Sequence, residues 1–151
     1  MKLIEVLEKI QVVVQDHPMI QMATICTSED LIIQVTENKN KYFHASIVYD
    51  MKPYPVGEYT VQLPFSIIIS DKLRTNDNNK LFIHSNTQSI CIDLISIIRG
   101  CLNSWGYDGM DNPIIELWTE KFSDALLAGA KLDFMLVSDL GGWCDIKPIN
   151  C

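Results

Sequence analysis

The chain has 151 residues, of which 48% are apolar and 21% charged, and its formal net charge is −7. This composition is typical of one globular domain and excludes an intrinsically disordered chain. The 12 basic residues are scattered, which argues against tight non-specific binding to nucleic acid, although an acidic protein can line a channel through which DNA passes.

The sequence predicts no membrane-spanning helix, no secretory signal and no disulfide framework or zinc site. Unbroken apolar runs, such as residues 67–69, are far shorter than the roughly 20 residues that a membrane-spanning helix needs. Glu5, Glu8 and Lys9 interrupt the apolar start, so we expect no secretory signal. The five cysteines form no C-x-x-C pair, which fits neither a disulfide framework nor a zinc site, and a reducing compartment is the default.

The chain is expected to begin with an amphipathic helix. Leu3, Leu7, Ile10 and Val14 are spaced by four, three and four residues and therefore form one apolar stripe. The helix should end before Pro18, because the residue ahead of a proline is disfavoured in helical geometry.

Short strands are expected next, at residues 22–27, 31–36 and 41–50. The clearest strand covers residues 59–70, where apolar side chains at odd positions from Val61 to Ile69 alternate with mostly polar ones. Pro64 cannot donate a hydrogen bond to a neighbouring strand, so it indicates an edge position or a bulge.

Between these strands, residues 51–58 read MKPYPVGE and predict an extended loop that projects an aromatic side chain. Met51, Pro53, Tyr54 and Pro55 are the candidate interface residues of this loop.

Two tryptophans beside predicted loops complete the candidate subunit or partner interface. These are Trp105 and Trp143. Aromatic side chains near loops are common interface anchors, but such side chains are as often lids over a core.

The middle of the chain predicts a short strand at residues 81–85, a cap at or near Thr87 and a helix at residues 88–102. This helix is apolar on nearly every face, so it is expected to be packed on two sides, either between a sheet and another element or against a second subunit. Residues 103–113 are expected to form a loop.

The last third predicts a short helix over residues 123–129, stopped at Gly129, and a strand over residues 130–138. Leu132, Phe134 and Leu136 should face the core, and Met135 and Val137 indicate that the opposite face is also covered. A tail from about residue 139 to 151 is expected to be extended.

The expected fold is therefore a single α+β domain over residues 1–151. It has an N-terminal helix, a mainly antiparallel sheet, a central apolar helix packed on that sheet and a C-terminal strand.

Catalytic patterns are weak. His17, His44 and His84 have no metal-type spacing, and we interpret them as structural residues, with His44 and His84 on the polar faces of strands. No nucleophile elbow and no glycine-rich phosphate loop occurs. We therefore expect no catalytic residue, no cofactor and no metal.

One enzyme pattern stays open. An acidic-x-Lys pair occurs at Glu37/Lys39 and again at Asp145/Lys147, and a metal-dependent nuclease can use an acid and a lysine in this way. Glu37 and Lys39 are more simply explained as a solvated turn. Asp145 and Lys147 come just before Pro148 near the terminus, which is a poor place for a rigid metal site.

The order of the elements resembles that of the tail terminator, or tail-completion, proteins that join heads to tails in tailed bacteriophages. The resemblance covers nearly the whole chain: LIEVLEKIQVVVQD, the strand group with its projecting loop, SICIDLISIIRGCL, the polar loop NSWGYDGMDN, and AKLDFMLVS. The residues Phe122, Asp124, Leu126 and Gly129 ahead of the last strand are also similar. The tail after residue 139 and the polar segment 70–80 are longer than the family's pattern.

The resemblance implies a non-enzymatic component of the virion tail or neck, made in the bacterial cytoplasm. Six or twelve copies would form a ring around the DNA channel and bind neighbouring neck or tail proteins, with no contact to a membrane and no specific binding of DNA. Two alternatives remain open: a small metal-dependent nuclease, and a cytosolic adaptor that binds one partner through its loops.

Overall fold

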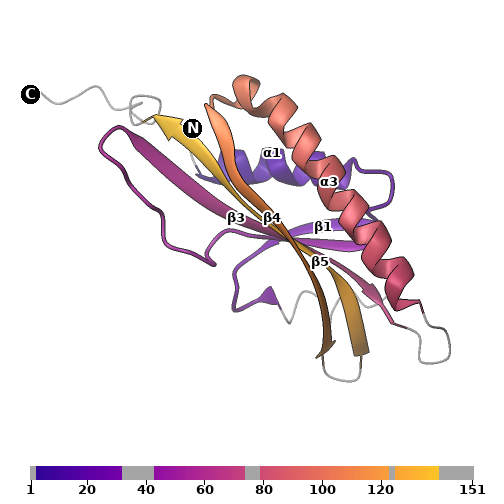
Figure 1. The fold of residues 1–151 in the computed structure, drawn as a ribbon. Helices are drawn as coiled ribbons and strands as arrows, with labels where there is room; N and C mark the ends of the chain where they lie inside the picture. The colour runs from indigo at the N-terminus through magenta and orange to yellow at the C-terminus, as the bar shows by residue number, and fades with distance from the viewer. Residues whose placement is uncertain (1–2, 32–42, 74–78, 123–124, 140–151) are drawn as a thin grey trace, which may run out of the picture.

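The computed structural model describes residues 3–31, 43–73, 79–122 and 125–139. The elements follow in the order α1 (Leu3–Gln15), β1 (Met22–Cys26), β2 (His44–Val48), β3 (Thr60–Lys72), α3 (Lys80–Trp105), β4 (Gly109–Phe122) and β5 (Ala125–Asp139). The strands form one sheet with the order β1-β2-β3-β5-β4 (Figure 1). Only the β1–β2 pair is parallel, so the prediction of an α+β fold with a mainly antiparallel sheet is confirmed.

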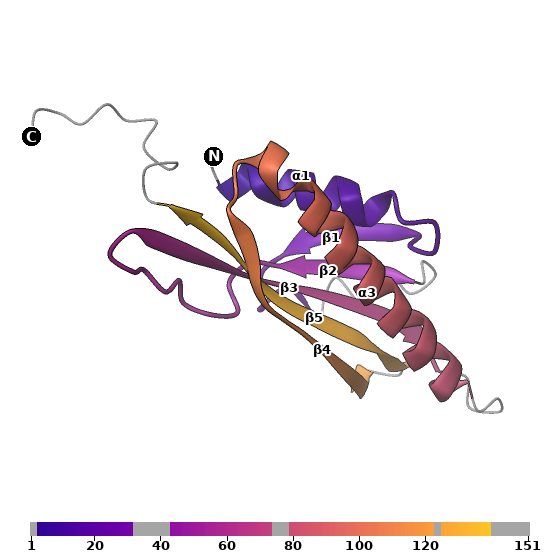
Figure 2. The same cartoon turned by 45° about the horizontal axis from the view of Figure 1, so that its top comes forward.

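Both helices cover the same face of this sheet (Figure 2). Helix α1 packs on β1 and β2, whereas α3 crosses β5 and β4. The core between the layers contains alternate residues of β3 and β5, which pair directly across the two strands, for example Phe65 with Phe134. The predicted core positions Leu132, Phe134 and Leu136 are confirmed.

Helix α1 follows its predicted stripe and ends ahead of Pro18. Leu7, Ile10 and Val14 are buried, together with Val6, while Ile4 lies on the exposed side. The strands predicted around residues 22–27, 41–50 and 59–70 are present as β1, β2 and β3. The strand predicted at residues 31–36 falls almost entirely outside the described residues.

Pro64 lies where β3 has only one long neighbour. The pairing of β2 with β3 covers Ser66 to Ser70 and stops before Pro64. The backbone N–H of Gln62 donates to Pro55 O at 3.0 Å, so it points away from β5. Backbone groups two residues apart in a strand point to the same side, so the nitrogen of Pro64 also points away from β5. The missing N–H of Pro64 therefore removes no hydrogen bond between β3 and β5. The strand itself is the central one of the sheet and not an edge strand, but its β2 side is unpaired at Pro64.

The strand predicted at residues 81–85 is wrong, because α3 begins at Lys80 and runs without a break to Trp105. Ile83 and Thr87 continue the buried stripe of Ile90, Leu94 and Ile98, at helical spacing. Thr87 is not a cap: it is buried inside the helix, and its hydroxyl donates to Ile83 O at 2.7 Å.

Helix α3 is packed on one side only by the described part of the chain. Ile92 and Ile97 on its outer side are exposed, so no second element covers this side among the described residues, and cover by a second subunit stays a prediction. By length and composition alone, the helix could also cross a membrane. The search for unbroken apolar runs in the sequence did not detect this. The core helix of a soluble protein passes the same test. Its buried stripe packs on the sheet, as in a core helix.

The last third forms a hairpin and not a helix followed by a strand. Residues 109–122 form β4, where a loop was predicted up to residue 113, and β5 begins at Ala125, inside the predicted helix. Gly129 is therefore not a helix stop. A Cβ added to it would lie 1.8 Å from Ile69 O, so glycine permits a close approach of β5 to β3. The predicted tail lies outside the described residues from residue 140 onwards.

Candidate functional site

The projecting loop between β2 and β3 is the clearest candidate interaction surface. Every residue from Met51 to Thr60 is exposed, which confirms that the predicted loop projects. Val56 and Tyr59 are 66% and 73% exposed. An interface role for Met51, Pro53, Tyr54 and Pro55 stays a prediction.

This loop is held in a defined conformation at its tip. Gly57 N–H donates to Thr60 O at 2.8 Å, and Val56 forms an isolated bridge with Val61. The tip therefore folds back on the start of β3 and presents Val56 and Tyr59 to solvent. Sequence reasoning missed these two residues, although the Gly57-Glu58 turn between them was a possible signal.

A cavity of about 380 Å³ opens between the base of this loop and β4. Its walls include Met51 and Lys52 from the loop, Pro64 and Ser66 from β3, and Met135 from β5. It lies on the sheet face opposite the helices.

The far wall of the cavity is made by an irregularity in β4. The pairing of β4 with β5 shifts between Asp111 and Ile114, and Asn112 has a φ of 49°, in the left-handed region. Asn112 and Pro113 line the cavity. This bulge bends the edge strand at the cavity and interrupts its hydrogen-bonded ladder.

A small polar cluster lies on the floor of this cavity. Ser66 and Asp133 pair directly across β3 and β5, and the Ser66 hydroxyl donates to an Asp133 carboxylate oxygen. Lys131 Nζ lies 3.6 Å from the other oxygen of Asp133. The carboxylate is thus engaged on both oxygens. It can orient a polar group of a ligand at the cavity mouth, but the cluster contains no imidazole or thiol that would serve as a base or nucleophile.

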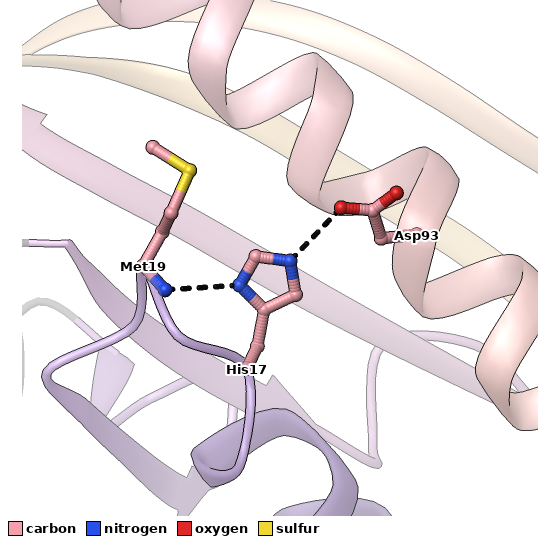
Figure 3. Close-up of polar contacts among 3 residues, drawn as sticks. All are labelled: His17, Met19 and Asp93. Carbon is pink, nitrogen blue, oxygen red and sulfur yellow. Dashed lines mark hydrogen bonds and ion pairs between the residues drawn. The ribbon is translucent and has the colours of Figure 1, made fainter.

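The three histidines are held by the fold. His44 is fully buried and lies within 3.2 Å of Thr24 Oγ1 and 3.4 Å of Ser46 Oγ, and burial lowers its pKa to about 4. His84 lies on α3 and not on a strand, and its Nε2 contacts Trp118 O at 2.9 Å. His17 contacts Asp93 across the gap between α1 and α3 (Figure 3).

Of the two predicted interface tryptophans, the structure describes Trp105. Trp105 is 7% exposed and belongs to the core at the end of α3, which favours the alternative of a lid over the core to that of an interface anchor. The helix ends there because Gly106 adopts a left-handed conformation, and Trp105 continues the buried stripe of Ile98 and Leu102 at helical spacing. Trp143 lies outside the described residues.

Metal and thiol chemistry find little support in the part of the chain that the structure covers. No group of three or more His, Cys, Asp or Glu residues that could hold a metal ion occurs among those residues. Both acidic-x-Lys pairs, Glu37/Lys39 and Asp145/Lys147, lie outside them. Burial raises the pKa of Cys26 to about 11 and that of Cys91 to about 12, so neither thiol is activated as a nucleophile.

No protein-family model and no curated protein sequence matches the chain. The function is therefore inferred from the arrangement of the chain's own residues.

Proposed function

We propose that the chain is a structural component of a tailed-bacteriophage virion. Copies of it form a ring in the tail or neck that joins head or portal to tail components around the DNA channel. The observation that carries this proposal is the projecting loop 51–59, whose tip is fixed by backbone hydrogen bonds while Val56 and Tyr59 remain exposed. A fixed and exposed apolar tip is suited to binding a protein surface, because little conformational entropy is lost when it docks.

Two further features support the proposal. Four elements of the resemblance, an N-terminal helix, strands with a projecting loop, a central helix and a closing strand, are present in the fold, whereas α3 and β4 occupy most of the predicted polar loop 103–112. The net charge of −7 suits a ring that lets DNA pass through its lumen without holding it.

Inactivation of the gene in the phage tests the proposal. We expect infected cells to accumulate heads and tails that are not joined, and we expect wild-type protein supplied in trans to restore complete particles. Electron microscopy of lysates distinguishes these products. Normal yields of complete particles without the protein would contradict a joining role.

An adaptor that binds one partner would use the same loop. It predicts a complex of fixed stoichiometry with a host protein and complete particles in the gene's absence, so the same experiment separates the two functions.

A further inference from the structure

Two exposed apolar surfaces lie at opposite ends of β3. The first is the loop tip, defined here as Val56, Glu58 and Tyr59, directly before β3 starts. The second is the helix-start patch, defined here as Lys80, Leu81, Phe82 and Leu126, beyond the end of β3. The 13 residues of β3 span about 40 Å. Figure 1 shows the loop and the start of α3 at opposite ends of this strand.

The helix-start patch is apolar to an unusual degree for an exposed surface. Leu81 and Phe82 are 79% and 65% exposed at the first turn of α3. Exposed Leu126 lies at the same end of the sheet, where its carbonyl accepts a hydrogen bond from Leu73 N–H just after β3. Large side chains gathered in this way commonly mark an interaction surface.

The two surfaces are complementary in charge. The loop tip carries the exposed Glu58, whereas the patch carries the exposed Lys80, and the first turn of α3 contains no acidic residue. Opposite charges beside apolar groups favour docking in one orientation and oppose the contact of two identical surfaces.

We infer that the loop tip of one copy docks on the helix-start patch of a second copy. The inference rests on the proposed function, which requires self-assembly, and it identifies the surfaces that assemble. Because the two surfaces differ, the contact is heterologous, and each copy can use both surfaces at once. Repetition of this contact gives a ring where the rotation between neighbouring copies closes, and an open filament where it does not.

Mixing two variants tests this contact. Tyr59→Asp removes the loop tip and Phe82→Asp removes the patch, so each variant alone should stay monomeric under conditions in which the wild type associates. An equimolar mixture should form a dimer and nothing larger, since one intact loop tip meets one intact patch. Gln88→Asp, at an exposed polar position on the same helix outside the patch, should associate like the wild type.

Charge reversal gives a second test that does not depend on loss of apolar contacts. Glu58→Lys and Lys80→Glu should each weaken association by about tenfold, because like charges then face each other. The mixture of these two variants should recover association in which the variants alternate, since every contact between the two variants joins opposite charges. Light scattering during size exclusion measures the mass in each case.

Several results would overturn the inference. A wild type that stays monomeric at millimolar concentration would show that the two surfaces do not bind each other. Mixtures that behave as the sum of their separate components would exclude a heterologous contact, as would a Phe82→Asp variant that still associates. The proposed function is contradicted by a different result, the formation of complete particles without the protein, so the two failures can be distinguished.

Discussion

His17 and Asp93 join the end of α1 to the middle of α3, with 3.0 Å between Nε2 and Oδ2 (Figure 3). The second ring nitrogen, Nδ1, accepts the backbone N–H of Met19 at 3.2 Å. The neutral ring must therefore carry its proton on Nε2 and donate it to Asp93. This pair fixes the turn that leads from α1 into β1 against the helix that covers the other half of the sheet.

His17→Ala is expected to lower the free energy of unfolding by about 1–2 kcal/mol, because two hydrogen bonds of a buried side chain are lost. The coupling energy with Asp93 in a double-mutant cycle should be below about 1 kcal/mol, since the Asp93 side chain is 59% exposed. Urea unfolding measures both quantities. Asp16→Ala, at an exposed neighbouring position, is the matched control, and an equal loss in that variant would contradict a specific role for His17.

Gly129→Ala should destabilise the chain by roughly 2–4 kcal/mol, because the added Cβ meets the backbone of Ile69 in the adjacent strand. Gly109→Ala in β4 meets no atom within 4 Å and should be close to neutral. Gly100→Ala, in the exposed part of α3, should stabilise by about 0.5–1 kcal/mol. Thermal and urea unfolding measure the stability of the three variants. Equal stabilities would contradict the close approach of β5 to β3.

Stability should fall as the pH is lowered from about 6.5 to about 4. Burial lowers the pKa of His44 from 6.5 to about 4, so the unfolded chain binds a proton in this range that the folded chain rejects. The contribution is fully present above pH 6.5 and amounts to at most about 3 kcal/mol. His44→Gln should show a smaller loss over the same range, and an unchanged slope in this variant would contradict the assignment.

Alkylation at pH 8 should label Cys101 before Cys26 and Cys91. Cys101 is half-buried, whereas the other two thiols are buried and their pKa values are raised to about 11 and about 12. The thiolate fraction of Cys26 should be about 100-fold below that of an ordinary thiol. Peptide mapping by mass spectrometry identifies the labelled sites, and rapid labelling of Cys91 in the folded state would contradict the packing of α3.

Long periodic patterns predicted the fold well, and short ones did not. The stripe of α1 and the alternation in β3 and β5 extend over enough residues to select one period. Residues 81–85 are too few to distinguish a strand from a helix, and only the continuation of their stripe to Ile90 and Leu94 identifies α3. The helix predicted before Gly129 failed because propensity over seven residues is weaker than pairing with β3.

The candidate site was predictable only in part. The prolines and Tyr54 indicated a projecting loop, because Pro53 and Pro55 restrict the backbone and favour extended structure. The exposure of Tyr59 and Phe82, and the burial of Trp105, depend on how distant elements pack. The cavity beside the loop depends on the bulge in β4, and no local sequence pattern predicted this bulge.

The copy number of the protein in purified virions tests the central claim most directly. Quantitative mass spectrometry, with a portal or capsid protein of known stoichiometry as the internal standard, measures this number. A ring component predicts a constant number, six or twelve copies per particle, that is retained after high-salt washing and density-gradient purification. Absence from purified particles, or an amount that varies with washing, would contradict the assignment as a structural ring subunit.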